Sequence, residues 1–568
     1  MRKSIIILTI LALAATSCKL DKFPHDQVSA ESMQTAENAV TATNGCYALF
    51  KSTPGYAGDI FVRHNEQLHE YKSDNVLMSG KSTDALFLDA TFQDSEVDDN
   101  VKNYWAEGYR ICYSTSNVIN VIPDDEQDAT LRHIKGENLF LRSFAHMQMC
   151  ELFAYPYSMG RDNPGIVLRL APMKDTPVRA TVGEVYDQLE KDLLQAIELM
   201  KGGKRRGDNG YADVNSARAL LARVYLHEEK WDDCIKICDE LLADGTHLDP
   251  DYENLFQNSR NSKEVLWCIA NAQTEEDYVG GKQVGQMFYS QGENGLAGAP
   301  GQKGWGEIYY SQPLLDLFER YPNDLRLTTM REKHIPNAAK KMIYWPVDSG
   351  QGTLENSIDF NPVDNGNGTW TAKDRDGNSH TIKQELVNTY PRWYYEDGGK
   401  HVYVSVADSS GCRTPDNIYP INYCKKYVHQ GGDVDQYALL SSPPMLRYAE
   451  VILNRAEAYA HKGEAGKALD DVNIIRDRAG LTGAANMTTG NMGDRGYTDV
   501  LDVVLDERRL ELCFEGFRTL DLQRNKKQLN RVYAGMHPTA TYEYNDPKIL
   551  YRIPQTEINA SGIEQNER

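Results

Sequence analysis

The sequence predicts a mainly α-helical fold in which tetratricopeptide-like helical hairpins form a scaffold and a long segment of mixed loops and strands is inserted between them. Helical periodicity dominates residues 31–242 and returns at 445–477 and 497–524. Two segments 234 residues apart repeat one hairpin pattern. Between them, residues 271–442 are rich in Gly, Asn, Asp and aromatic side chains and alternate in the manner of β-strands.

The chain begins with the pattern of a secretory signal. Arg2 and Lys3 precede an apolar run at 5–15, which is too short to cross a bilayer because a spanning helix needs about 20 apolar residues. Small residues at 14–17 lead into Cys18, and this pattern resembles the lipobox of bacterial lipoproteins. We therefore expect acyl chains on the thiol and new amino terminus of Cys18, which together anchor a protein stably. An ordinary signal peptide followed by a chance cysteine is the alternative.

Composition argues against nucleic acid and anionic lipid as partners. The chain has 82 acidic and 61 basic residues among 568, a formal net charge of −21. Phosphate groups are bound by Lys and Arg, and an acidic surface repels them. Solubility is the simplest explanation of this charge, and the length suffices for two or three domains or one large one.

The ten cysteines form no CxxC pair and no zinc-binding pattern. Cys234 and Cys238 are the closest pair and share one face of an amphipathic helix. We favour core packing for them over a metal site or a disulfide, because cysteine is a common small core residue.

The repeated hairpin consists of a helix with small residues on one face, a tight turn and a second amphipathic helix. Tetratricopeptide-type hairpins nest against one another in this way. Because a long insertion separates the two copies in sequence, we expect the fold to bring them together. The matched pairs are Ala222 with Ala456, Tyr225 with Tyr459, Cys234 with Ala468, Ile235 with Leu469 and Cys238 with Val472.

The inserted segment predicts strands at 369–371 and 401–406, with turns at 364–366 and 376–378. Oxygen side chains from Asp374 onward have partial EF-hand spacing, but a serine stands where the calcium loop needs Gly. We favour an ordinary hairpin turn there over a calcium site.

Aromatic residues are concentrated in the insertion. Sugar rings stack their C–H faces on aromatic rings while Asn, Asp and Arg bind their hydroxyls, so this composition suits a glycan surface. The alternative is that most of these rings fill the small core of the insertion. They are Trp305, Tyr309, Tyr310, Trp345, Trp370, Trp393, Tyr394 and Tyr395.

Three carboxylates recur every four residues near the C-terminus: Glu507, Glu511 and Glu515. Glycoside hydrolysis needs two carboxyls about 5–10 Å apart across a cleft, and a single helix face has no cleft. We instead predict an ion-pair network with nearby Arg508, Arg509 and Arg518 that locks the C-terminal helix. HExxH, GxSxG and a phosphate-binding loop are absent, so the sequence predicts no enzyme, no metal and no cofactor.

Short motifs recur along almost the whole chain in a fixed order behind the lipobox. They are Leu20–Pro24, Gly136–Ser143 (GENLFLRS), Ala219–Leu226 (ALLARVYL), Leu446–Val451 (LRYAEV), Asn454–Ala458 (NRAEA), Ile475–Leu481 (IRDRAGL), Glu507–Leu512 (ERRLEL), Phe514–Arg518 (FEGFR) and Ile553–Glu557 (IPQTE). Together they resemble the SusD/RagB family of outer-membrane glycan-binding lipoproteins from Bacteroidetes.

The resemblance implies a scaffold of tetratricopeptide-like helical pairs and a lipid anchor in the outer membrane, with the bulk of the protein facing the exterior. It also implies a partner, a SusC-like TonB-dependent transporter, over whose extracellular mouth the lipoprotein sits as a lid. In such pairs the lipoprotein captures an oligosaccharide, or in some members a peptide, and delivers it to the pore. No catalysis is attributed to the family.

By the same resemblance, the ligand surface combines loops of the insertion with the segment that follows Ser73. Trp305 is the leading aromatic candidate, because the Gly-rich loop around it cannot bury it well; Asp74 could instead cap local structure. The expected ligand-binding residues are Trp305, Asp74, Asn75, Tyr309, Trp345 and Trp393.

The predicted protein is thus a nutrient-capture lipoprotein that binds a glycan. A peptide or glycopeptide binder, a protein-interaction scaffold and a surface hydrolase are the alternatives. We expect a signal peptide at 1–17, a tether at 18–30, an N-terminal helical scaffold at 31–270, the aromatic-rich insertion at 271–442, and a C-terminal helical scaffold with a closing segment at 443–568.

Overall fold

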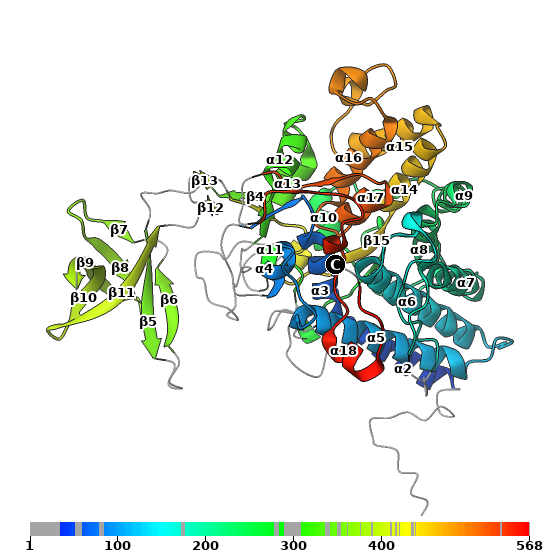
Figure 1. The fold of residues 1–568 in the computed structure, drawn as a ribbon, viewed down its shortest axis with the longest axis horizontal. Helices are drawn as coiled ribbons and strands as arrows, with labels where there is room; N and C mark the ends of the chain where they lie inside the picture. Colours follow the sequence, from blue (N-terminus) through cyan, green and yellow to red (C-terminus); the bar gives the residue numbers. More distant parts are fainter. Residues whose placement is uncertain are drawn as a thin grey trace, which may run out of the picture.

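The structure is a computed structural model that describes most of the chain between Thr35 and Asn566 (Figure 1). Cys18 with the signal and tether, and Trp305 with its Gly-rich loop, lie outside the described residues. The described residues are 35–51, 60–78, 85–171, 177–275, 277, 283–288, 308–334, 341–348, 354–359, 362–374, 376–387, 390–408, 412–414, 417–419, 421–432, 437, 439–533 and 537–566.

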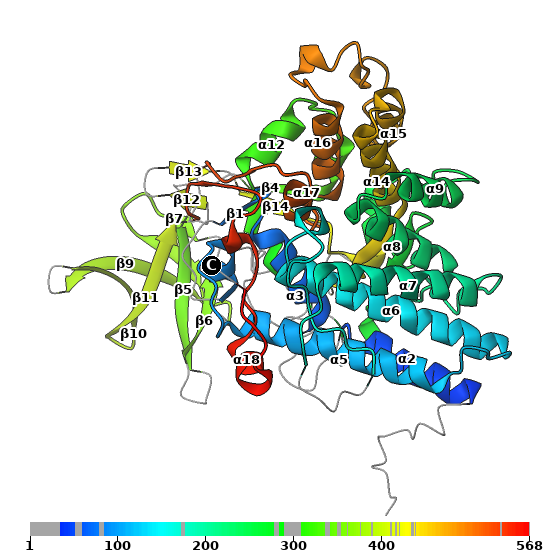
Figure 2. The same cartoon turned by 45° about the vertical axis from the view of Figure 1, so that its right-hand side comes forward.

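Four long helices build the N-terminal part of the scaffold: α2 (Ala36–Ala48), α5 (Asp99–Val121), α6 (Ala129–Phe153) and α7 (Val182–Met200). Helix α6 is almost wholly buried and packs between α5 and α7 (Figure 2). Asp128 caps α6 by accepting hydrogen bonds from the first free backbone N–H groups. Trp105 and Cys112 of α5 are buried in the main core.

Shorter elements connect these helices to the rest of the scaffold. They are α3 (Phe61–Tyr71), β1 (Val76–Met78), α4 (Ala85–Ala90), η2 (Tyr157–Met159), α10 (Tyr252–Gln257), β2 (Val265–Cys268), η3 (Gln273–Glu275) and α11 (Gly285–Phe288).

The two repeated hairpins lie side by side, as the sequence predicted. They are α8 (Val214–His227) with α9 (Trp231–Leu241), and α14 (Tyr448–His461) with α15 (Ala465–Arg478). Helix α14 packs against both α8 and α9. The Trp231 and His461 rings stack across this junction with centroids 4.2 Å apart. Cys234 and Cys238 are buried free thiols at the same junction, which confirms core packing.

Strand β15 (Pro444–Arg447) replaces the start of a predicted helix. The sequence predicted helix from Met445, but this segment pairs antiparallel with β2 and α14 begins only at Tyr448. The prolines at 443 and 444 hold their preceding residues in an extended conformation, which favours the strand.

The predicted helical region at 497–524 is broken in the middle. Phe514 and Gly516 have φ of 63° and 79°, a left-handed conformation that ends an α-helix. Glu515 therefore lies in the break and not on the same helix as the other two carboxylates. The closing elements are η5 (Gly483–Ala485), η6 (Gly493–Arg495), α16 (Val500–Leu512), α17 (Arg518–Arg524), β16 (Leu529–Asn530), β17 (Thr541–Tyr542), η7 (Pro547–Ile549) and α18 (Gln555–Ser561).

The segment between the two hairpins combines small helices with an antiparallel sheet that projects to one side of the helical body (Figure 1). Strand β3 pairs with β1, and β14 pairs with β4. The smaller elements are β3 (Ile308–Tyr310), α12 (Gln312–Glu319), α13 (Leu325–Met330), β4 (Arg331–His334), β12 (Cys412–Thr414), β13 (Asn417–Tyr419), β14 (Ile421–Cys424) and η4 (Gln430–Gly432).

Seven strands form the projecting sheet in the order β6-β5-β11-β10-β9-β8-β7. Its predicted strands and both predicted turns are present, and Asp374 closes the β8–β9 turn by accepting backbone hydrogen bonds from Asp376 and Asn378. The strands are β5 (Lys341–Asp348), β6 (Leu354–Asp359), β7 (Val363–Asp364), β8 (Trp370–Lys373), β9 (Ser379–Val387), β10 (Tyr390–Asp397) and β11 (Lys400–Asp408).

The sheet begins and ends at one hairpin of the body. His334 of β4 lies opposite Ile421 of β14, so the two chain ends that lead to the sheet are neighbours. The sheet also has an apolar cluster of its own, separate from the main scaffold core. The chain therefore enters and leaves this sheet at one place on the body.

We predict that Gly516→Ala destabilises the protein strongly. A Cβ at Gly516 would lie 2.8 Å from the Cβ of buried His69, and φ is positive as well. Together, the steric contact and the strained backbone should lower the free energy of unfolding by about 2–4 kcal/mol, measured by urea denaturation.

Gly463→Ala is the matched control, because Gly463 has φ of 74° but open space around its Cβ. It should lose only about 1 kcal/mol, the cost of the backbone strain. An equal decrease in the free energy of unfolding in both variants would show that the contact with His69 does not contribute to the destabilisation.

Candidate functional site

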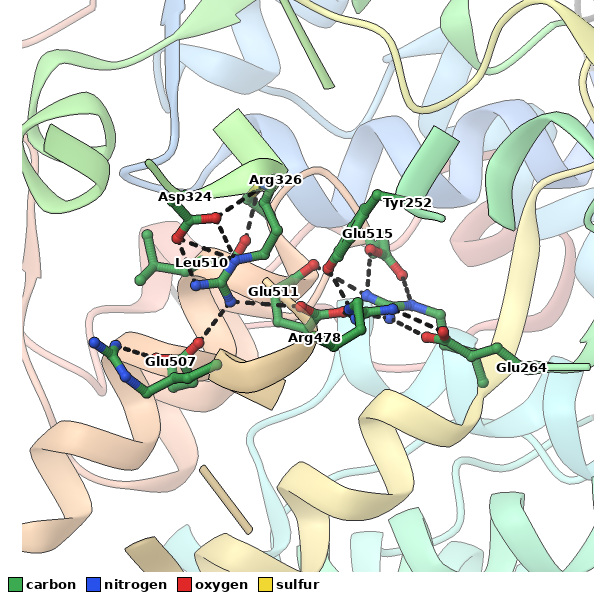
Figure 3. A network of polar contacts seen from close by, with 12 residues as sticks. Tyr252, Glu264, Asp324, Arg326, Arg478, Glu507, Leu510, Glu511 and Glu515 are labelled. Atoms are coloured by element: carbon green, nitrogen blue, oxygen red, sulfur yellow. Dashed lines mark hydrogen bonds and ion pairs between the residues drawn. The ribbon is translucent and has the colours of Figure 1, made fainter. Parts of the chain in front are cut away.

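The C-terminal carboxylates belong to a buried ion network (Figure 3). Glu511 is fully buried and meets three arginines from other segments. Arg447 donates to it at 2.6 Å, Arg326 lies at 3.4 Å, and Arg478 forms a further ion pair. Burial alone would raise the pKa of Glu511, but these three positive charges hold it well below its usual range.

The two flanking carboxylates are paired in the same way. Arg476 donates to Glu507 at 2.9 Å. Arg447 and Lys426 donate to Glu515 at 2.8 and 2.7 Å. The prediction that these carboxylates form ion pairs is therefore confirmed, but their partners are not the predicted Arg508, Arg509 and Arg518. The carboxylates are enclosed in protein rather than placed across a cleft where hydrolysis could occur.

The arginines that the sequence assigned to this network have other partners. Arg508 donates to Asp521 at 2.9 Å. Arg509 and Arg518 both reach Asp74, with Arg518 Nε 2.8 Å from a carboxylate oxygen. Glutamate and arginine are interleaved along this segment, but their ion-pair partners lie on other elements.

Asp74 and Asn75, which were expected to bind ligand, lie in the interior. Burial alone would raise the pKa of Asp74, but the positive charges of Arg509 and Arg518 hold this pKa at about 2. Asn75 accepts a hydrogen bond from Arg509 at 2.8 Å and donates to Glu70 at 2.9 Å. Both side chains join the N-terminal segment to the C-terminal helices, and the binding surface proposed below does not use them.

Three of the predicted aromatic contacts are also packed against protein. Tyr309 is buried on β3, where its ring lies 5.2 Å from that of Tyr423. Trp345 is 3% exposed and packs on Tyr395 inside the sheet, and Trp393 is half-buried beside the same apolar cluster. These rings fill the small cores of the insertion, which was the alternative left open by the sequence.

Helix α3 carries two further buried carboxyl groups. Burial and the nearby negative charge of Glu515 raise the pKa of Glu66 to about 8. Tyr427 donates to Glu66 at 3.3 Å. Burial also raises the pKa of Glu70, against hydrogen bonds from Asn75 and other donors. Glu66 is therefore protonated in the folded protein at neutral pH.

We predict that Glu66→Gln stabilises the protein at high pH. The pKa of Glu66 is near 4.5 in the unfolded chain and about 8 in the folded protein. At any pH between these two values, folding therefore takes up a proton at Glu66. The wild-type protein therefore loses stability across that interval as pH rises, whereas Gln, which mimics the protonated acid, does not. The gain in the free energy of unfolding should approach about 5 kcal/mol above pH 8 in urea denaturation.

Below pH 4.5 the Glu66 variant and the wild-type protein should have equal stability. Glu37→Gln, at an exposed position on α2, is the control and should match the wild-type pH profile. A constant difference at all pH values would contradict the assignment.

The outer face of the sheet carries a second group of aromatic side chains. Tyr394 alternates with the inward Trp393 and Tyr395 on β10, and it lies opposite Tyr403 on β11. Tyr394 stacks on His401 with centroids 3.8 Å apart, and Tyr403 is 38% exposed. The rings lie on the face of the sheet opposite its apolar cluster.

Charged side chains surround these rings. Tyr403 donates to Glu385 at 2.8 Å, and His401 Nδ1 lies 2.9 Å from the same carboxylate oxygen. These hydrogen bonds lower the pKa of Glu385. The Arg392 guanidinium lies 5.3 Å from the Tyr403 ring centroid. We name Glu385, Arg392, Tyr394, His401 and Tyr403 the Tyr403 surface.

The Tyr403 surface combines exposed rings with planar hydrogen-bonding groups. Such a combination binds flat apolar faces and hydroxyl groups together. Tyr403 was not among the ligand contacts predicted from the sequence. The alternation at 401–406 contained the signal, since it places Tyr403 opposite Val402 and Val404.

Comparisons with known proteins identify the family. Residues 263–567 match the SusD family, and residues 21–226 match a family described as starch-binding and associating with outer membrane. The chain belongs to the SusD family. The description of the family matched by residues 21–226 indicates carbohydrate binding and association with the outer membrane.

Relatives extend over the whole chain at low identity. SusD-like protein P2 of Formosa agariphila is 23% identical, over 97% of this chain and 96% of the relative. A SusD superfamily structure from Bacteroides thetaiotaomicron has a TM-score of 0.67 at 22% identity and covers 94% of this chain and 100% of that one. A laminarin-binding SusD-like protein has a TM-score of 0.59 at 19% identity, covering 93% and 98%. These structural matches confirm the fold.

Proposed function

We propose that the protein is a non-enzymatic surface lipoprotein that binds a glycan and delivers it to a SusC-like TonB-dependent outer-membrane transporter. Membership of a carbohydrate-binding family supports the ligand class. The observation that carries the proposal is the Tyr403 surface, an exposed aromatic and polar patch on a projecting sheet.

The proposed binding uses both kinds of side chain on that surface. A pyranose lies with its C–H face on the Tyr403 and Tyr394 rings, while Arg392 and Glu385 bind its hydroxyl groups. Each contact is weak, so affinity comes from several sugar units on a flat face and from high local concentration beside the pore. No step of this capture needs a cofactor or a metal.

The proposed location rests on the N-terminal pattern. Within the part of the chain that the structure describes, no helix is long and apolar enough to cross a membrane. Acyl chains on Cys18 would hold the protein on the outer membrane with its bulk facing the exterior, and the 18–30 tether would keep it beside its transporter. Trp305 remains a proposed ligand contact in the same insertion.

A peptide or glycopeptide ligand is the second candidate. The sheet is open, and its edge strands β6 and β7 each have one side without a neighbouring strand among the described residues. An extended peptide can add to such an edge through backbone hydrogen bonds. A sugar would instead bind the face of the sheet. Substitutions on the face should therefore weaken sugar binding, and substitutions on an edge strand should weaken peptide binding.

We predict that Tyr403→Ala weakens glycan binding about tenfold, because it removes the ring that stacks on sugar. The measurement is calorimetry of the purified protein against a panel of soluble glycans that includes laminarin and starch oligosaccharides. Tyr113→Ala is the matched control, since Tyr113 is 44% exposed on α5, outside the sheet.

The control should bind as tightly as the wild-type protein. Binding that Tyr403→Ala and Tyr394→Ala leave unchanged would remove the Tyr403 surface from the proposal. Binding to peptides and to no glycan in the panel would overturn the sugar assignment.

A further inference from the structure

A pocket on the scaffold lies between three segments that are far apart in the sequence. It has a volume of about 370 Å³, which is within the range of small-ligand sites. Its walls are the η2 turn after α6, the turn after α17 and the segment before η7. The lining residues that matter here are Tyr155, Ser158, Asn163, Lys526, Tyr544 and Asn545.

Hydrogen bonds hold these walls together. Ser158 Oγ donates to the Arg524 carbonyl at 3.0 Å, and Tyr155 donates to the Asn545 carbonyl at 3.4 Å. Gln523 donates to the Tyr544 carbonyl at 3.3 Å. The pocket is therefore formed before a ligand arrives, which reduces the entropy lost on binding.

Lys526 occupies a position that its backbone disfavours. Its φ of 55° lies in the left-handed region, directly after the end of α17. Glycine is the usual residue at this place, because it has no Cβ to clash. A lysine at this position lowers the stability of the folded protein. Residues with strained backbones of this kind are concentrated at functional sites.

The side chain of Lys526 places a positive charge at the pocket. Lys526 is exposed at the pocket and pairs with no carboxylate among the residues described. In a chain with a net charge of −21, an unpaired ammonium in a pocket is a local site for an anion. The side-chain amide of Asn545 is exposed beside it.

We propose that this pocket binds a sugar unit that carries a carboxylate. The Tyr155 and Tyr544 rings supply faces for the pyranose, the Asn163 and Asn545 amides bind its hydroxyl groups, and Lys526 binds the carboxylate. Inorganic phosphate would satisfy the ammonium but leave the rings without a partner. This site is on the helical scaffold, so its test does not depend on the Tyr403 surface.

The test is a calorimetric titration of the purified full chain at physiological salt. The three ligands are D-galacturonate, D-galactose and inorganic phosphate. We expect galacturonate to bind at least tenfold more tightly than galactose or phosphate. Lys526→Met keeps the length of the side chain without its charge and should reduce galacturonate binding to the level of galactose. Tyr403→Ala should leave it unchanged.

A second variant separates binding from folding. Lys526→Gly relieves the backbone strain, so its Tm should equal or exceed that of the wild-type protein while galacturonate affinity falls about tenfold. Lys204→Met, at another exposed lysine, is the control and should change neither quantity. Equal affinity for galacturonate and galactose, phosphate binding as tight as galacturonate binding, or unchanged affinity in both Lys526 variants would overturn the proposal.

Discussion

The fold depends on the buried charge of Glu511. A carboxylate in the interior is tolerated only when cations and hydrogen bonds compensate its lost hydration. Arg326, Arg447 and Arg478 come from three different segments, and all three meet Glu511. A buried charge that loses its compensating partners destabilises a protein by about 3–5 kcal/mol. The network therefore enforces one arrangement of these segments.

That arrangement positions the root of the projecting sheet. Arg326 lies on α13, directly before β4, and Lys426 follows β14 and pairs with Glu515. The backbone of Lys425 also donates to Met330 at 2.9 Å across this root. Both chain ends that lead to the sheet are thus fixed to the same set of carboxylates. The scaffold therefore fixes the place from which the sheet projects.

This organisation separates stability from recognition. The ion network and the nested hairpins, with the main core around α6, contain the residues whose replacement should affect folding. The Tyr403 surface and the Lys526 pocket use side chains whose removal leaves those cores intact. Specificity can then change through exposed residues of the sheet while the scaffold stays the same, because core packing and surface contacts share few residues.

Much of the scaffold could be predicted from the sequence, because helical periodicity and the hairpin repeat are local signals. The nesting of the two hairpins, the burial of Cys234 and Cys238, and strands β8 and β11 of the sheet follow from such patterns, whereas the other strands of the sheet were not predicted.

Contacts between distant segments could not be predicted. The sequence shows that Glu511 stands among arginines, but only the fold shows that its partners are Arg326, Arg447 and Arg478. The sequence alone suggests that Asp74 and Asn75 are exposed loop residues. In the structure, Arg509 binds both side chains and they are buried. Tyr403 could have been found, because alternation along one strand assigns residues to faces.

The most direct test of this account is the removal of the sheet. Because His334 and Ile421 are paired, residues 335–420 can be replaced by an Asn-Gly turn that closes the β4–β14 hairpin. Thermal unfolding and calorimetry of this variant should give a Tm within about 3 °C of the wild-type protein and no binding of neutral glycans such as laminarin and starch oligosaccharides. A variant that fails to fold, or one that folds and retains full glycan affinity, would contradict the account.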